Sequence, residues 1–294
     1  MRISITPELV AQLIAEQFPE WANLPVQAVE PGGVDNRTFR LGEALLVRLP
    51  SAEGYAAQVE KEQRWLPVFA PELPLPIPLP VAMGRPSLGY PFSWSVYRWI
   101  GGESVDWVDV ADLDLESMAL ALARFLKALH AIDTAGGPAP GAHNYFRGAH
   151  PSVYDAQARS SIEALSPVID KVQAMRVWEE AIASSWQGAP VWVHGDIAAG
   201  NLLVDEKGAL VSVIDFGCMG VGDPACDLTI AWTLFAGESR KVFRDELGVD
   251  ADTWARARGW ALWKAGLELV ALEDRDSPAG ERFLKVLRAL YREV

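Results

Sequence analysis

The chain has 294 residues, half of them hydrophobic and 22% charged, which is a globular composition and excludes a disordered, collagen-like or low-complexity protein. Its 26 basic and 39 acidic side chains give a formal net charge of −13, which argues against nucleic acid or an anionic membrane as the main partner. The length is sufficient for one large domain or for two smaller lobes around a shared cleft.

An amphipathic helix is predicted at the N-terminus, ahead of a small antiparallel sheet. Thr6 is suited to cap this helix, and Pro7 would be its first residue. The segment lacks a basic start followed by an apolar run and a small-residue cleavage site, so we do not expect a secretory signal. Residues 26–50 are expected to form two or three strands, with a turn at 32–36 and a clear strand at 44–50.

A helix is expected next, because residues 56–69 have apolar side chains at helical spacing. Residues 65–84 carry closely spaced prolines, which exclude a membrane helix and predict an extended connector. Residues 81–91 are predicted to form a strand, a turn and a returning strand. Residues 93–100 are apolar and aromatic and predict another strand, which ends at Gly101. The first hundred residues thus predict a small antiparallel sheet with one helix.

Helical periodicity dominates the rest of the chain. Residues 135–144 are predicted as a loop, and three short apolar segments at 191–196, 201–205 and 209–217 favour strands. The predicted helices span residues 112–132, 151–165, 168–185, 224–236, 238–247, 251–273 and 278–292.

These elements predict an α+β fold with two lobes and a cleft between them. The N-lobe would comprise residues 1–99 and the C-lobe residues 100–294, joined near 97–103. Their net charges are −2 and −11, so the helical lobe carries nearly all the excess acidity. Cys218 and Cys226 form neither a CxxC motif nor a Cys/His cluster, so we expect no disulfide framework, no zinc site and a reducing, cytoplasmic location.

The most informative segment runs from His194 to Asn201, between two of the apolar segments. Asp196 and Asn201 are five positions apart and can converge if the loop curls, where a carboxylate can take a proton from a hydroxyl and an amide oxygen can bind Mg²⁺. Asp215 ends another apolar segment just before a Phe-Gly turn. Two oxygen ligands on adjacent loops are typical of Mg²⁺, which keeps waters and substrate phosphates as its other ligands.

This pair of motifs resembles the Asp-x-x-x-x-Asn and Asp-Phe-Gly signature of protein kinases. Because the loop begins His-Gly-Asp, the chain is similar to the aminoglycoside phosphotransferase family, which includes macrolide and choline-type kinases. Further segments follow in that family's order, so the resemblance covers essentially the whole chain. They are GGVDNRTFRLG (32–42), LLVRLP (45–50), the helix of Glu62, LPLPIPLP (73–80), YRWIGG (97–102) and GDPACDL (222–228).

The resemblance implies a protein-kinase-like bilobal fold, with a nucleotide-binding N-lobe and a catalytic, substrate-binding C-lobe. It implies transfer of the γ-phosphoryl group of ATP to a hydroxyl of a small molecule, with Mg²⁺ as cofactor. Asp196 matches the family's catalytic base, and Asn201 and Asp215 match its metal ligands. His194 matches a position with a structural role, and Asp227 matches a residue that supports the catalytic loop.

The resemblance also implies a cofactor-binding ion pair. Glu62 matches the helix glutamate that pairs with a basic residue on the third strand, which here would be Arg48. Many family members have Lys at this position; Arg keeps the charge but can place the phosphates differently or share the role with Arg37 or Arg40. Glu60 is the alternative partner, and an ordinary surface ion pair is the alternative role.

The remaining cofactor-binding residues are implied by position. Gly32, Gly33 and Asn36 match the loop that covers the nucleotide, although a simple hairpin turn explains them as well. Tyr97 and Trp99 lie in the implied hinge, where backbone groups would contact adenine. The apolar walls of the purine site would come from Val47, Val96, Leu203 and Ile214, and candidates for the acceptor cleft are Trp99, Trp107, Trp232, Trp260 and Trp263.

Other functions stay open at this point. A nucleotide-binding pseudoenzyme would keep the site without transferring phosphate, and a metal-dependent hydrolase would use His194 as a ligand. Because the chain runs from Asp215 directly into residues 220–228, it has no room for a long activation loop, and a protein substrate is disfavoured. The acidic C-lobe favours an amine-bearing acceptor such as an aminoglycoside, and homoserine, choline and sugar-type acceptors are the alternatives. The sequence leaves the oligomeric state and the choice between ATP and GTP open.

Overall fold

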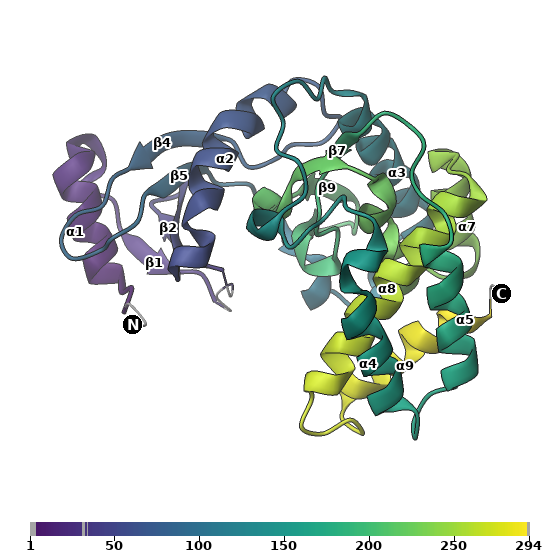
Figure 1. Cartoon of the computed structure of the whole chain (residues 1–294). Coiled ribbons are helices and arrows are strands. Elements are labelled where there is room, and N and C mark those ends of the chain that lie inside the picture. Colours follow the sequence, from purple (N-terminus) through teal and green to yellow (C-terminus); the bar gives the residue numbers. More distant parts are fainter. Residues whose placement is uncertain (1–3, 31–32, 34, 293–294) are drawn as a thin grey trace.

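An antiparallel sheet of five strands, in the order β1-β2-β3-β5-β4, forms the N-terminal part of the computed structural model, which describes residues 4–30, 33 and 35–292. Three strands fall within residues 26–50, as predicted. The strands are β1 (Val26–Ala28), β2 (Asn36–Leu41), β3 (Leu45–Pro50), β4 (Pro80–Gly84) and β5 (Trp94–Arg98). Figure 1 shows this sheet and helix α1 (Pro7–Gln17) at one end of the molecule, away from most of the other helices.

Helix α1 begins as the sequence predicts. The Thr6 hydroxyl accepts a hydrogen bond from the backbone N–H of Leu9 at 3.3 Å, and Pro7 is the first helical residue. A threonine cap satisfies one of the N–H groups that have no partner inside the helix, and proline lacks one of them altogether. The apolar side of α1 packs on one face of the sheet, where Val10 and Leu13 are fully buried.

Helix α2 (Glu53–Phe69) covers the other face of the sheet and reaches the C-terminal part. It continues through Pro67 to Phe69, so the prediction of an extended connector over 65–84 was wrong at both ends: the irregular stretch spans only residues 70–79, and β4 follows. Pro67 lies in the last turn, where a lost backbone hydrogen bond is offset by burial of the aromatic residues around it. Trp65 and Phe69 lie 4.6 and 4.7 Å from Trp192, measured between ring centroids.

Some strand residues point to a different face of the sheet from the one that the sequence predicted. Adjacent residues of a strand point to opposite faces. Val47 and its partner Val96 point toward α1 and are fully buried there, whereas Arg48 and Tyr97 lie on the α2 face. The prediction that Val47 and Val96 line a purine site was therefore wrong. Their side chains point to the α1 face, whereas the next residue on each strand points to the α2 face.

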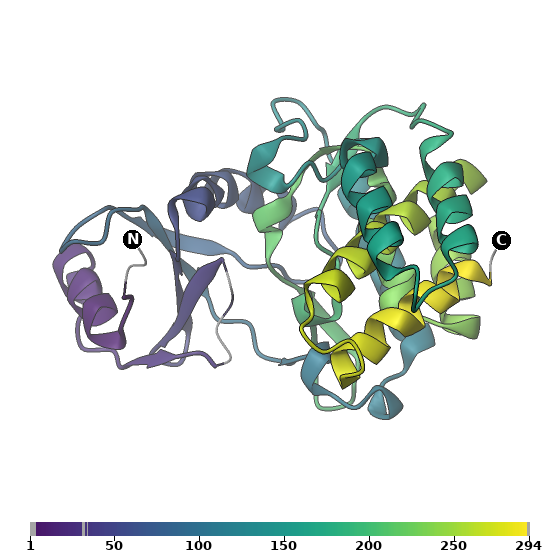
Figure 2. The same cartoon turned by 60° about the horizontal axis from the view of Figure 1, so that its bottom comes forward.

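The C-terminal part is mainly helical, as predicted. Its α-helices are α3 (Leu115–Ala131), α4 (Asp155–Leu165), α5 (Lys171–Ile182), α6 (Ile230–Thr233), α7 (Gly237–Leu247), α8 (Ala251–Ala271) and α9 (Pro278–Tyr291). The predicted helix at 224–236 is instead a 3₁₀ segment, Pro224–Thr229, followed by the short α6. In Figures 1 and 2, α4, α5, α8 and α9 form a group at the opposite end from α1.

Short strands position the loops between the sheet and this helical group. β7 (Val191–Val193) pairs with β10 (Gly220–Gly222), and β6 (Glu103–Ser104), β8 (Leu202–Val204) and β9 (Leu210–Val213) form a second small sheet. The predicted segments at 191–196, 201–205 and 209–217 thus each contain a strand. Within the described residues, no helix combines the length and apolar character needed to span a bilayer.

Candidate active site

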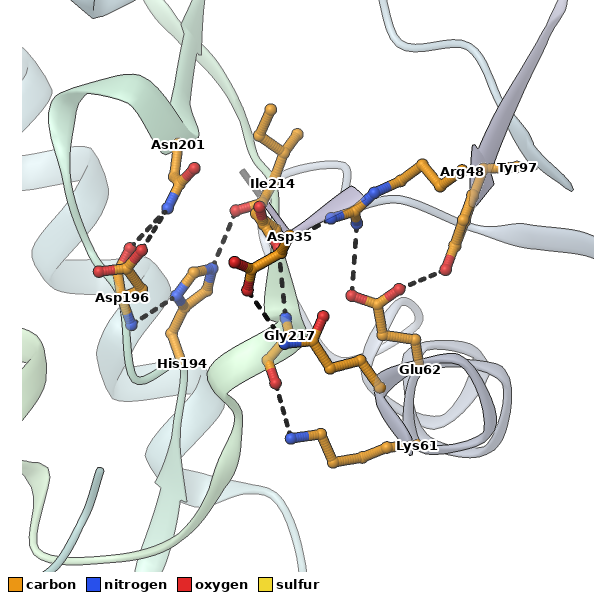
Figure 3. Close-up of polar contacts among 12 residues, drawn as sticks. Asp35, Arg48, Lys61, Glu62, Tyr97, His194, Asp196, Asn201, Ile214 and Gly217 are labelled. Atoms are coloured by element: carbon orange, nitrogen blue, oxygen red, sulfur yellow. Dashed lines mark hydrogen bonds and ion pairs between the residues drawn. The ribbon is translucent and has the colours of Figure 1, made fainter. Parts of the chain in front are cut away.

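The loop from His194 to Asn201 connects β7 to β8, and Asp215 follows β9. The backbone N–H of Ile214 donates to the carbonyl oxygen of Asn201 at 2.9 Å, which fixes the two loops side by side. The Asn201 side-chain amide donates to the backbone oxygen of Asp196 at 2.8 Å and to its Oδ2 at 3.2 Å. The loop therefore curls as the five-residue spacing predicted, and brings these polar groups together (Figure 3).

Asp196 has a second partner that the sequence did not reveal. Lys264 Nζ, on helix α8, lies 2.7 Å from Asp196 Oδ1. Burial raises the pKa of Asp196, but the charge and hydrogen bond of Lys264, with smaller effects of Arg147 and His194, outweigh burial, so this pKa lies below its ordinary value. Asp196 is thus an ionised carboxylate whose side chain is still 35% exposed. Such a group can accept a proton from a hydroxyl in contact with it.

His194 is fully buried, and both of its ring nitrogens are occupied by backbone groups. Nδ1 accepts from the N–H of Asp196 at 3.2 Å, so Nε2 carries the proton and donates to the carbonyl of Ile214 at 3.0 Å. Burial lowers the pKa of His194, which keeps the ring neutral. This arrangement orders the loop and leaves no nitrogen for a metal ion, so it does not support the metal-dependent hydrolase.

Asp227 fixes the start of the same loop. Its two carboxylate oxygens accept the backbone N–H groups of His194 and Gly195, each at 2.7 Å. Gly195 has a φ of +85°, and a Cβ there would lie 2.3 Å from the backbone oxygen of Cys218. Only glycine therefore fits this turn without a shift of the neighbouring chain.

Arg48 connects the N-terminal sheet to this loop region. Its Nη1 lies 3.4 Å from Glu62 Oε1, and its Nη2 lies 3.0 Å from Asp215 Oδ1. The Tyr97 hydroxyl donates to the other oxygen of Glu62. Burial raises the pKa of Glu62, whereas the charge of Arg48 favours the ionised form. Glu60, the alternative partner, is exposed, and Arg37 and Arg40 contact other groups.

Asp215 has a left-handed backbone, with a φ of +64°. This conformation is unfavourable for residues other than glycine and costs roughly 1–3 kcal/mol, a strain that is common at functional sites. One carboxylate oxygen of Asp215 is held by Arg48, and its side chain is 41% exposed. The Asn201 amide nitrogen faces Asp196, which turns its oxygen away from that residue (Figure 3).

An Mg²⁺ ion fits this pair of side chains. Carboxylate and amide oxygens are the donors that Mg²⁺ prefers, and it binds few protein groups because it keeps waters and phosphates. Within the part of the chain that the structure describes, no cluster of three or more His, Cys, Asp and Glu side chains forms a metal site. Asp215 and Asn201 thus carry the kinds of donor oxygen that an Mg²⁺ ion with few protein ligands would need.

The turn before β2 lies next to these groups. Gly32 lies outside the described residues; a Cβ on Gly33 would lie 3.4 Å from the backbone oxygen of Asn36, the buried first residue of β2. Asp35, which the sequence analysis did not select, accepts a hydrogen bond from Gln58 at 3.2 Å. Burial and the nearby charge of Asp215 raise the pKa of Asp35, although its hydrogen bond to Gln58 opposes the shift.

Lys61 is a second contact that the sequence did not reveal. From α2, its Nζ donates to the carbonyls of Gly217 and Met219 at 2.7 and 3.1 Å, and to His143 Nδ1 at 3.4 Å. Burial lowers the pKa of Lys61 to about 8. Lys61 thus connects α2 to the chain that follows Asp215.

The predicted hinge residues have two different environments. The Tyr97 ring is buried, and its hydroxyl supports Glu62. Trp99 lies past the end of β5, where its backbone N–H donates to Ala44 at 2.8 Å and its ring lies 4.5 Å from the Arg40 guanidinium.

One sequence signal could have pointed to Lys264. It is the only charged residue between Arg258 and Glu268, in a run of apolar and aromatic residues, and a lysine placed there needs a partner for its charge. Lys61 has no such signal, because its surroundings in the sequence are polar.

Comparisons with known proteins identify a family and similar folds. Residues 27–260 match the sequence model of the phosphotransferase enzyme family. The GDP complex of wild-type aminoglycoside 2′-phosphotransferase-IIIa has a similar fold, with a TM-score of 0.71 and 19% identity over 98% of this chain and 99% of that chain. No curated protein sequence matches significantly.

Two further solved structures are similar. The macrolide 2′-phosphotransferase from Brachybacterium faecium, an apoenzyme, has a TM-score of 0.62 and 19% identity over 96% of this chain and 97% of that chain. The streptomycin–ATP ternary complex of APH(2″)-IIa has a TM-score of 0.59 and 18% identity over 99% and 97%. At these identities the likeness concerns the fold, which is the predicted α+β kinase-like fold.

Proposed function

The chain belongs to the phosphotransferase enzyme family, and we propose that it transfers the γ-phosphoryl group of ATP to a hydroxyl of a small molecule. The observation that carries this proposal is the convergence of two sets of groups. Asp196 and Asn201 are held together on one loop, and Arg48 reaches across from the N-terminal sheet to Asp215 beside them. A base, two oxygen ligands for a metal and a cation for phosphates are the parts that phosphoryl transfer requires.

The two lobes would divide the substrates between them. Residues 1–99 would bind the nucleotide. The segment that contains Gly32, Gly33 and Asn36, the last being the first residue of β2, would cover the phosphates, and the backbone near Trp99 would contact the base. Arg48 would contact the α- and β-phosphates, with its orientation fixed by Glu62. Tyr97 would act through Glu62, because its hydroxyl is bonded there. Residues 100–294 would carry the base and the acceptor.

Asn201 and Asp215 would hold Mg²⁺, which neutralises phosphate charge when it is bound. In the reaction, Asp196 would orient the acceptor hydroxyl and accept its proton. The hydroxyl oxygen would form a bond to the γ-phosphorus as the bond to the β–γ bridging oxygen breaks, and ADP would leave. His194 and Asp227 would hold the loop through its backbone, so that Asp196 keeps its place during the transfer.

Two measurements test this function. ATP should raise the melting temperature substantially more with Mg²⁺ than without it, because the nucleotide and the metal bind together. ADP production should be stimulated by an acceptor from a library of small hydroxyl compounds. Asp196→Asn should abolish transfer and retain ATP binding, whereas Asp252→Ala, which removes an exposed carboxylate at the start of α8, should leave both unchanged.

The outcomes separate the alternatives. Binding of ATP without transfer to any hydroxyl compound would identify a pseudoenzyme, and absence of ATP binding would refute the proposal. Full turnover by Asp196→Asn would show that Asp196 is not the base. An amine-bearing acceptor, which the acidic C-lobe favoured, receives no support from the charges in contact with Asp196, since its closest charged partner is Lys264.

A further inference from the structure

Two cations lie near Asp196, one on helix α8 and one packed against its tryptophans. Lys264 Nζ contacts Asp196 Oδ1 at 2.7 Å, and the two side chains are 36% and 35% exposed. An acceptor whose hydroxyl contacts Asp196 therefore also meets the ammonium group of Lys264. Its three N–H groups allow Lys264 to donate to Asp196 and to a ligand at the same time.

Arg147 is the second cation. Its guanidinium lies 5.1 and 4.9 Å from the ring centroids of Trp260 and Trp263 on α8. Trp260 lies one helical turn before Lys264, and Trp263 directly precedes it. Its Nε is buried without a hydrogen-bond partner, and none of the ion pairs among the described residues includes Arg147. The positive charge of Arg147 adds to that of Lys264 in lowering the pKa of Asp196. Arg147 as a whole is only partly buried and its Nη atoms are not among the buried groups without a partner, so an anionic ligand would reach the guanidinium through these outer nitrogens.

Aromatic side chains stand beside these cations. Tyr145 and Phe146 have left-handed backbones, with φ of +52° and +53°, and are 42% and 38% exposed. The Tyr154 ring stacks on Trp263, with 4.1 Å between centroids, and its hydroxyl donates to the carbonyl of Tyr145 at 2.9 Å. These aromatic residues, partly exposed next to Trp263, offer a surface on which the apolar part of a ligand could pack.

We propose that Lys264 and Arg147 bind an anionic group of the acceptor, and that Tyr145, Phe146 and Tyr154 contact its apolar part. The acceptor class would be a hydroxyl compound with a carboxylate or phosphate and an apolar ring or chain. This inference rests on the proposed phosphotransfer at Asp196. Because both cations would repel an ammonium group near the reactive hydroxyl, the same site disfavours polyamines such as aminoglycosides.

A matched series of acceptors tests the charge preference. 4-(Hydroxymethyl)benzoate, its amide and 4-(aminomethyl)benzyl alcohol share a ring and a hydroxyl, and differ in a negative, neutral or positive group. Phosphorylated product is quantified by mass spectrometry, and binding of each compound is measured by ligand-observed NMR with a non-hydrolysable ATP analogue and Mg²⁺. The benzoate should exceed the amine in kcat/KM and in affinity by roughly tenfold or more, the effect of one charge-assisted hydrogen bond.

Variants assign this preference to the two cations. Lys264→Met also perturbs Asp196 and should lower turnover for every acceptor, so the informative quantity is the benzoate-to-amine ratio within each variant. That ratio should fall toward one in Lys264→Met and in Arg147→Gln. It should stay at the wild-type value in Lys285→Met, which removes an exposed lysine of α9. If Lys264 had only a structural role, Lys264→Met would lower the rates with the benzoate and with the amine equally and leave their ratio unchanged.

The results distinguish this inference from the proposed function. Equal or preferred use or binding of the amine, or an unchanged ratio in both variants, would overturn the anionic acceptor class while leaving phosphotransfer intact. Failure of ATP to bind or of any hydroxyl compound to be phosphorylated would refute the proposed function. In that case the NMR affinities of the unmodified protein still decide whether the cations select an anion.

Discussion

Substitution of Arg48 tests how the N-terminal sheet is connected to the loop that carries Asp215. Arg48→Met removes the cation that lies 3.4 Å from Glu62 and 3.0 Å from Asp215. The Glu62 side chain is only 5% exposed, so its charge would remain buried without compensation. Breaking a buried ion pair in this way costs about 3–5 kcal/mol. Arg48→Lys keeps the charge, but one ammonium replaces two guanidinium nitrogens, and about 1–3 kcal/mol should be lost with one hydrogen bond.

Urea unfolding of the nucleotide-free protein measures these losses. The double variant Arg48→Met/Glu62→Gln should be more stable than Arg48→Met alone, because the neutral amide can still bond to Tyr97 and leaves no buried charge. The cost of Arg48→Met should also shrink as the pH falls from 7, by up to about 1.4 kcal/mol per pH unit, since Glu62 can then be protonated. A pH-independent loss below 1 kcal/mol, or a double variant less stable than the single one, would refute this reasoning.

Three further changes test the loop and its contacts. Asp227→Asn leaves one acceptor for two buried N–H groups, so it should cost about 1–3 kcal/mol in urea unfolding and lower kcat. Gly195→Ala should cost at least about 2 kcal/mol in thermal unfolding through its positive φ and its clash with Cys218, whereas Gly101→Ala, with open space around it, should be nearly neutral. Lys61 has a pKa of about 8 when folded and an ordinary value of 10.5, so the unfolded chain binds more protons between these values and stability should rise with pH there. Lys61→Met should remove that rise, by up to about 3 kcal/mol of difference in urea unfolding, and an identical pH profile in both proteins would contradict the buried position of Lys61.

Local signals predicted much of the fold. Thr6 and Pro7 set the start of α1 through the hydrogen-bonding needs of a helix end, which neighbouring residues decide. The register of β3 was not predictable in the same way. Helices α1 and α2 cover both faces of the sheet, so the segment from Leu45 to Pro50 is apolar on both sides apart from Arg48, and alternation does not reveal which face Val47 takes.

The same distinction applies to the candidate site: contacts between residues close in sequence were predictable, and contacts between distant residues were not. Asp196 and Asn201 are close in sequence, and the loop geometry that joins them follows from that spacing. Contacts made by distant residues have no such signal: Lys264 meets Asp196 across 68 positions, and Lys61 meets Gly217 across 156. The sequence therefore indicates the proposed base and metal ligands, whereas the charges around Asp196 depend on how α2 and α8 pack.

The charges around Asp196 change what the acidic net charge indicates about the acceptor. The C-lobe carries 29 of the 39 acidic residues, and taken as a whole this excess would attract a cationic acceptor. Exposed charges, however, are screened over about 8 Å at physiological ionic strength, whereas a partly buried contact at Asp196 is screened much less. The proposed acceptor would bind within reach of Asp196, where Lys264 at 2.7 Å and the charge of Arg147 act on that carboxylate. The bulk acidity thus bears on solubility and on the approach of ligands, and the two cations bear on which hydroxyl compound can react.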